Sequence, residues 1–586
     1  MTTKPSRPVL SFLWRPNEIT PAVVEAARQT STGAIFDIST HTTDDTAKAL
    51  RASGATDIKI SAEEIMQTAL EGFLQDSGVK TVWVEYHPAL VTCTPEAFLE
   101  RLLELSTRFT CIPVSGDLAL LTLILQLAQA PRAVAVKGAE TAGFVSNETT
   151  GILYATLREK ANHQGRCPEV MIWGGVATPE AAAAFLCSGT KGIVFESLHW
   201  QTDLVSADQS LKQRLSRLRP EHTAVVGHGL DVACRFYDKG NSLAVKELKQ
   251  YADTQFSCAV TEDHRRAFAR RVKETVIPVL ESDLGRQDLV FMGPEAAFAP
   301  VFAERFGRST RQALASFLDE VERLCWEAPQ KLDRFAENAA ARSLGTQYPI
   351  IQGAMTWISD SLEFARAVSE AGGLPTLALG LKSRVDLEKD LNRLGEIMGQ
   401  VPYAVNFIAL PENPHLEAQL AWIEQLRPPY AVIAAGDPSH AARLQEHGIQ
   451  TIYVASSADL IRMALGAGVR FVVLEGSEAG GHVGEYSTLT LAQMALELKR
   501  KEPELFRDRY VVLAGGIYNR ETAFRAFMLG ADAIQMGTAY LATREIVATG
   551  ALSPLYQRLV VDSDPGATAI SGESVGLRVR SLKTPV

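Results

Sequence analysis

The chain has 586 residues, of which 46% are hydrophobic and 22% are charged, and its formal net charge at pH 7 is −10. This length exceeds what one hydrophobic core holds, so we expect at least two domains. The acidic balance argues against general nucleic-acid binding. No stretch approaches the roughly 18 consecutive apolar residues of a transmembrane helix, so we expect no membrane span.

The cysteines and the N-terminus indicate a cytoplasmic protein. The seven cysteines form no CxxC pair, and none follows Cys325. This distribution is typical of reduced thiols rather than of a disulfide framework or a zinc site. The first residues, Met1 to Pro5, lack the apolar core of a signal peptide. We therefore predict a cytoplasmic protein without a structural metal.

The sequence contains a long internal repeat. Residues 8–12 match residues 349–353 at an offset of 341, and Gly174-Gly175-Val176 matches Gly515-Gly516-Ile517 at the same offset. Residues 137–145 match residues 475–483 at an offset of 338. Landmarks that recur in one order predict a duplicated architecture.

Each copy is predicted to contain eight strands. In the second copy, apolar and β-branched runs occupy residues 349–352, 374–379, 403–408, 430–434, 451–454, 470–475, 510–513 and 533–536. The first copy also gives eight runs, among them residues 33–39, 81–87, 133–138 and 169–175. Helical patterning separates the runs, so we predict tandem (β/α)₈ TIM-type barrels, the first of them degenerate. An open doubly wound sheet is the alternative.

The predicted domains are a first barrel at residues 1–205, a mainly helical connector or docking region at 206–340, and a second barrel at 341–586. Within the connector, residues 311–321 have the apolar spacing of an amphipathic helix. A helical lid over one barrel is the alternative for this region. A basic patch at residues 264–271 could meet an acidic partner, or it could be a solvated helix face.

One segment of the second copy combines glycines with an ionisable ring. Residues 475–484 read Glu-Gly-Ser-Glu-Ala-Gly-Gly-His-Val-Gly and follow an apolar run. Glycines allow a flat ligand to approach the backbone closely, and an imidazole titrates near neutral pH. His482 is therefore the candidate for proton transfer at the mouth of the second barrel.

Two further loops of the second copy indicate a phosphate site. Gly515 and Gly516 follow the seventh strand, and Gly537 and Thr538 follow the eighth. In (β/α)₈ barrels these two loops commonly bind phosphate through backbone N–H groups. A side chain in place of glycine would hold the phosphate away from those groups.

Two features near the other strand ends suit a flavin ring. Asn406 ends the third strand, and its amide offers the donor and acceptor that match the pyrimidine edge of an isoalloxazine. Gly353-Ala354-Met355 supplies small residues where a ring passes the backbone after the first strand. An asparagine that only satisfies a loop is the alternative for Asn406.

These motifs together resemble one superfamily, which comprises the nitronate monooxygenases (2-nitropropane dioxygenases) and the flavin-dependent enoyl-[acyl-carrier-protein] reductases. Similar reductase domains occur in polyketide and polyunsaturated fatty acid synthases. The resemblance covers residues 341–586 and implies a non-covalent FMN, with NAD(P)H as electron donor in a reductase. It implies that Gly515, Gly516, Gly537 and Thr538 hold the FMN phosphate. It also implies contacts to the rest of the cofactor from Gly353, Ala354, Met355, Asn406, Glu475, Gly480, Gly481 and Gln535.

Three functions follow as alternatives. An enoyl-thioester reductase would use His482 to donate a proton to the α-carbon of an acyl chain on an acyl carrier protein. A nitronate monooxygenase would use His482 as a base and consume oxygen, and a scaffold would catalyse nothing. The additional barrel and helical region favour the reductase because extra surfaces suit a tethered carrier. We also expect a homodimer.

The first copy lacks the residues that carry this chemistry. Three replacements distinguish it, namely Phe144 for His482, Lys137 for Glu475 and Glu196 for Gly537. A carboxylate at Glu196 would repel a phosphate and fill the space that a glycine leaves open. We therefore predict a first barrel without flavin. A barrel that binds another anion through Lys137 is the alternative.

Overall fold

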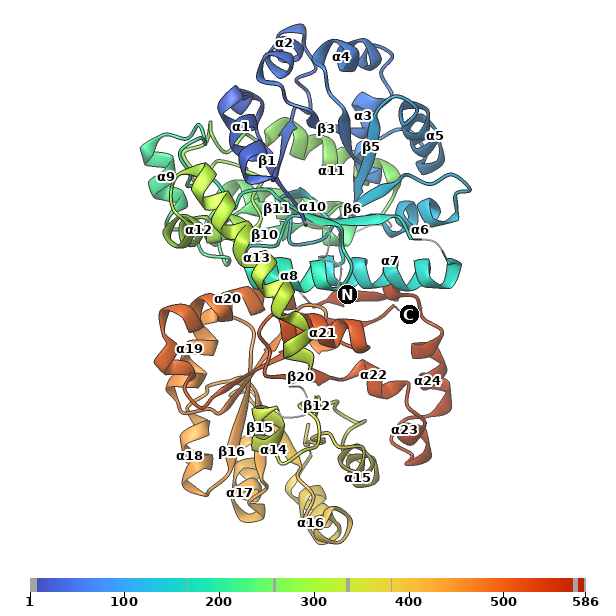
Figure 1. Ribbon diagram of the computed structural model, residues 1–586. Coiled ribbons are helices and arrows are strands. Elements are labelled where there is room, and N and C mark those ends of the chain that lie inside the picture. Colours follow the sequence, from blue (N-terminus) through green and yellow to red (C-terminus); the bar gives the residue numbers. More distant parts are fainter. Residues whose placement is uncertain are drawn as a thin grey trace. The chain divides into compact units, whose positions relative to one another are not determined.

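The computed structural model describes residues 8–165, 167–256, 260–333, 338–380, 382–572 and 578–583. It divides into two compact units, Met1–Trp326 and Glu327–Val586, whose elements are labelled in Figure 1. Within the described ranges, no helix is both long enough and apolar enough to cross a bilayer.

The first unit contains a closed barrel of eight parallel strands. In barrel order the strands are β1 (Val9–Trp14), β2 (Gly33–Asp37), β3 (Asp57–Ser61), β4 (Thr81–Glu85), β5 (Thr110–Ser115), β6 (Ala133–Lys137), β8 (Glu169–Trp173) and β9 (Gly192–Phe195). The barrel closes where β1 pairs with β9. Large apolar side chains such as Trp83 and Trp173 fill its interior.

The second unit repeats this arrangement. Its parallel strands are β12 (Ile350–Gln352), β13 (Thr376–Ala378), β14 (Ala404–Ala409), β15 (Tyr430–Gly436), β16 (Gln450–Ala455), β17 (Phe471–Glu475), β19 (Tyr510–Ala514) and β20 (Ala533–Met536). A parallel bridge between Ile351 and Leu374 joins the two ends of the sheet. All eight predicted strands are confirmed, and the doubly wound alternative is wrong because the first and last strands meet.

Each unit also carries a small antiparallel sheet beside its barrel. In the first unit, β7 (Gly143–Phe144) pairs with β11 (Cys234–Tyr237), which pairs with β10 (Thr223–Val226). In the second unit, β18 (Gly481–His482) pairs with β22 (Val579–Leu582), which pairs with β21 (Thr568–Ser571). The repeat therefore continues beyond the barrels themselves.

Most of the segment that the sequence assigns to a connector lies within the first unit, which extends to Trp326. Helices α10 (Leu243–Phe256) and α11 (Glu262–Thr275) pack with the β10–β11 hairpin in one apolar cluster that includes Phe144. Phe144 follows β6, so the cluster covers the C-terminal ends of the strands of the first barrel. The amphipathic helix predicted at residues 311–321 is confirmed within α13 (Thr310–Asp333).

The structure corrects the repeat at its first strand. Ser11 pairs with Val194 in the first barrel, whereas Ile351 pairs with Gln535 in the second. Because Val194 and Gln535 are 341 positions apart, Ser11 corresponds to Ile351 at an offset of 340. The predicted offset of 341 is wrong here by one residue, which would turn each side chain to the opposite face of the strand.

Candidate functional site

The predicted cofactor residues meet at the C-terminal ends of the strands of the second barrel. The Gly353 amide donates a hydrogen bond to the Met536 carbonyl at 2.8 Å. A methyl group placed on Gly480 would lie 3.7 Å from Thr538 Oγ1, and one placed on Gly537 would lie 3.8 Å from Met355 Sδ. The loops that follow the first, sixth and eighth strands therefore converge on one place.

Small residues keep this mouth open. The pairing of neighbouring strands shows which residue of the first barrel corresponds to which residue of the second. At three positions the second barrel has small side chains and the first has larger ones: Gly353 against Leu13, Ala378 against Asp37, and Ala514 against Trp173. The same backbone thus frames a space in the second barrel that side chains fill in the first.

Asn406 and Glu475 are polar residues at this mouth. The side-chain amide of Asn406 is buried, and its Nδ2 donates a hydrogen bond to the Val432 carbonyl at 3.2 Å. This is the one hydrogen bond of that side chain to a residue that the structure describes. Burial raises the pKa of the Glu475 carboxyl to about 7, with no neighbouring charge among the causes. Both side chains therefore retain hydrogen-bonding capacity for a ligand.

The loops after β19 and β20 form a cradle of backbone amides. Gly515 and Gly516 adopt left-handed φ values of 100° and 67°, and a methyl group on Gly515 would lie 2.9 Å from Thr488 Oγ1. The N–H groups of Gly516, Thr538 and Ala539 make no hydrogen bond to any residue in the described ranges. Sequence reasoning missed Ala539, because a backbone donor leaves no signal in the residue type.

His482 is exposed on the two-residue strand β18. Its backbone pairs with Val579 of β22, close to the C-terminal end of the chain. The structure describes residues 578–583 of this end, and Leu577 and residues 584–586 lie outside the described ranges. The C-terminal strand therefore fixes the position of the histidine.

Two side chains that sequence reasoning left without a role hold this turn. Glu478 accepts hydrogen bonds from the amide and the hydroxyl of Thr488, the first residue of α20 (Thr488–Lys501). Arg580 donates to the Ser477 carbonyl at 2.8 Å. The first unit keeps both arrangements, with Glu140 bound to Thr150 and Arg235 bound to the Ala139 carbonyl. Because that unit has Phe144 in place of the histidine, we assign these contacts to positioning.

Gln352 was also missed. Its side chain is fully buried at the end of β12, where Oε1 accepts from the Thr376 amide at 3.0 Å and Nε2 donates to the Gly353 carbonyl. The side chain thereby fixes the loop that begins at Gly353. The sequence feature that could have identified Gln352 was its position at the end of the predicted strand 349–352.

At the mouth of the first barrel, buried charges pair with one another. Lys59 contacts Asp37 at 2.9 Å and Glu85 at 2.7 Å, and Lys137 also pairs with Glu85. These carboxylates raise the pKa of Lys59 well above its usual value, although burial opposes them. Lys137 is therefore already neutralised by the chain itself, which argues against its proposed role with an added anion.

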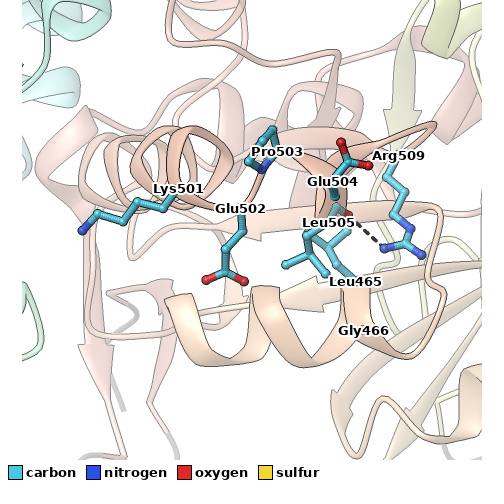
Figure 2. A pocket seen from close by; sticks show the side chains of 8 residues that line it. All are labelled: Leu465, Gly466, Lys501, Glu502, Pro503, Glu504, Leu505 and Arg509. Carbon is cyan, nitrogen blue, oxygen red and sulfur yellow. Dashed lines mark hydrogen bonds between the residues drawn. The ribbon is translucent and has the colours of Figure 1, made fainter.

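A surface pocket of the second unit lies away from the candidate site. Figure 2 shows its lining, which comes from the end of α19 (Ala458–Gly466), the end of α20 and the segment before β19. These are loops at the N-terminal ends of the strands, opposite to the mouth. Within the described ranges, no group of three or more His, Cys, Asp or Glu side chains is placed to hold a metal ion.

The second unit has recognisable relatives. Residues 338–586 match the profile of the family described as nitronate monooxygenase. A protein of Staphylococcus saprophyticus named "Probable nitronate monooxygenase" is 30% identical over 281 residues, which is 41% of this chain and 77% of that protein. A nitronate monooxygenase of Pseudomonas aeruginosa is 28% identical, over 43% of this chain and 79% of that protein. The solved structure of FabK from Thermotoga maritima is 31% identical with a TM-score of 0.37, over 42% of this chain and 75% of that one.

Proposed function

Because the chain belongs to the nitronate monooxygenase family of flavin-dependent oxidoreductases, we propose that its second unit binds FMN and reduces enoyl thioesters with NAD(P)H as the electron donor. The substrate is an acyl chain carried as a thioester, on an acyl carrier protein. The flavin, when bound, supplies the hydride that reaches the β-carbon.

The amide cradle is the observation that carries the FMN proposal. Three N–H groups, of Gly516, Thr538 and Ala539, have no acceptor among the described residues, and they lie where barrels of this type bind phosphate. The first N–H groups of a helix have no acceptor within the helix itself, and an anionic ligand would satisfy all three donors. The residues present therefore fit the phosphate of FMN.

The other residues would act around the ring. Gly353 and Ala514 leave room for a flat group, whereas Asn406 and Glu475 offer hydrogen bonds at its edges. His482 is exposed at the mouth and would donate a proton to the α-carbon of the substrate. Glu478 and Arg580 would hold the turn that carries this histidine.

Apolar surface near the mouth supports an acyl substrate. Trp357, two residues after Met355, is 81% exposed and has a positive φ of 63°. Leu555, Tyr556 and Leu559 are exposed on α24 (Pro554–Val561), which is anchored to the end of α22 (Thr538–Leu541) through Gln557. An acyl chain benefits from such surface, whereas a small nitronate does not require it.

Nitronate oxidation is the second candidate. The similarity to proteins named nitronate monooxygenase favours it. In that reaction His482 would remove a proton from the substrate, and oxygen would be the oxidant. The mouth residues suit either reaction, because both need a flavin and a histidine that handles a proton.

Anaerobic absorbance near 450 nm separates the candidates. A reductase bleaches when NADPH or NADH is added, and a crotonyl thioester restores the colour. Bleaching by propyl nitronate but not by a nicotinamide nucleotide would instead establish the oxidase. A colourless protein that takes up no added FMN would contradict both. The cytoplasmic location and the homodimer stay predictions.

A further inference from the structure

The first barrel contains a buried carboxylate bound by three backbone amides. Glu295 belongs to the short helical segment Pro294–Phe298 and is 1% exposed. One carboxylate oxygen accepts from the Gly175 amide at 3.1 Å. The other accepts from the Ser197 amide at 2.7 Å and the Leu198 amide at 2.9 Å. The carboxylate thus joins the loops that follow β8 and β9.

The three donors are the counterparts of the open amides in the second barrel. Gly175, Ser197 and Leu198 correspond at an offset of 341 to Gly516, Thr538 and Ala539. The strand register supports this offset, because Trp173 and Ala514 occupy equivalent places beside Lys137 and Glu475. The same cradle therefore exists twice, once with a carboxyl group in it and once with no partner among the residues that the structure describes.

We propose that Glu295 is a built-in substitute for a ligand phosphate, and that the cradle of the first barrel is an anion site filled by the chain's own carboxylate. Removal of this carboxylate creates a site for inorganic phosphate. The proposal rests on the repeat and the three amide contacts, and it does not depend on the reaction of the second unit.

The surroundings limit the ligand to a small anion. Glu196 lies at the edge of the cradle, where it accepts from the Ala142 amide and the Trp173 indole. Leu13 and Trp173 fill the space next to it. These side chains occupy the place of a flavin ring, so the ligand that we expect is a small anion such as inorganic phosphate.

The carboxyl group of Glu196, beside the cradle, disfavours a further negative charge there. Burial and the neighbouring Glu196 raise the pKa of Glu295 to about 8, against the amide donors that favour its ionised form. Burial raises the pKa of the Glu196 carboxyl, whereas the positive charge of Lys137 lowers it. Replacement of Glu196 by glutamine should therefore strengthen phosphate binding once Glu295 has been removed.

The Glu295 carboxyl group also explains how the loops of the first barrel are held together without a cofactor. Glu295 connects to them from 97 to 120 positions further along the chain. It supplies the acceptor oxygens that a bound phosphate would otherwise provide. We therefore expect one flavin per chain, in the second unit.

Calorimetric titration with sodium phosphate at constant ionic strength tests the proposal. The Glu196→Gln/Glu295→Ala chain, which lacks both carboxylates, is expected to bind one more phosphate per chain than Glu196→Gln alone, at least about tenfold more tightly than any binding at the filled cradle. Glu295→Ala alone should bind phosphate more weakly than this double variant, because the Glu196 carboxylate remains beside the cradle. Glu281→Ala, which alters an exposed carboxylate nearby, should behave as the wild type. Equal titrations of Glu196→Gln and Glu196→Gln/Glu295→Ala would overturn the proposal.

Hydrogen exchange locates the effect. Phosphate should slow amide exchange at residues 174–198 in Glu295→Ala, but not in the wild type or in Glu295→Gln, whose side chain still fills the cradle. If Glu295→Ala does not fold in chloride buffer, recovery of folded protein in phosphate buffer would support the proposal. Equal loss in both buffers, or equal rescue of Glu295→Gln, would refute it.

Discussion

Glu478 accepts two hydrogen bonds from Thr488, one from its amide at 2.9 Å and one from its hydroxyl at 3.1 Å. These bonds fasten the turn that precedes His482 to the start of α20. Thr488 also donates to the Ala514 carbonyl at 2.8 Å, so the turn is connected to the loop after β19 as well. The histidine turn and the phosphate cradle therefore form one structure.

Glu478→Ala should lower both thermal stability and turnover while leaving the flavin content near that of the wild type. The change leaves the buried Thr488 amide without its acceptor, which typically costs about 1–3 kcal/mol. Glu485→Ala, at an exposed position of the same loop, is the control. Melting temperatures and turnover numbers that match this control would show that Glu478 does not position the turn.

His482→Ala should keep its flavin and lose about 10²–10⁴-fold in turnover, because a general acid or base contributes that much. Because the ring is exposed, we expect the variant to fold. His447→Ala, at an exposed position after α18 (His440–Glu446), is the matched control. Turnover that is unchanged in His482→Ala would demote the residue to a structural role.

Gly537→Glu copies Glu196 of the first barrel and should abolish FMN binding. The first carbon of the new side chain fits, since its nearest neighbour would be Met355 Sδ at 3.8 Å. The effect therefore comes from the carboxylate placed beside the cradle. Gly466→Glu is the control, because a methyl group there meets nothing within 4 Å. Absorbance at 450 nm after gel filtration gives the flavin content, and a yellow Gly537→Glu protein would show that the cradle is misassigned.

Glu475→Gln should make the flavin-free protein more stable at pH 8, with a much smaller gain at pH 5. Burial raises the pKa of Glu475 from 4.5 to about 7, so the folded state binds a proton that the unfolded state releases between these values. Stability from this group is therefore present at low pH and is lost as the pH rises towards 7, by up to about 3 kcal/mol. Melting temperatures of Glu475→Gln and the exposed-site control Glu485→Gln across this range measure the difference. A gain that does not depend on pH would contradict the assignment.

The strands could be predicted because parallel barrel strands are short, apolar and separated by helices, as residues 470–475 and 510–513 illustrate. The predicted offset at the first strand was wrong by one residue. It was set by aligning Pro8 with Pro349, and both prolines lie outside the paired residues of the strands. Only the pairing of Ser11 with Val194, and of Ile351 with Gln535, reveals which side chains face inward.

By itself, the sequence determined the duplication, the two barrels and the glycine loops with His482, because each leaves a local pattern of residue types. The tertiary structure decided that the first cradle is filled by Glu295 and that Lys137 is paired with Glu85. It also showed that the amides of Thr538 and Ala539 have no acceptor within the described ranges. Such contacts join side chains and backbone groups that lie far apart in the chain, and backbone donors are the same for nearly every residue type. Only the folded positions reveal which of them are satisfied.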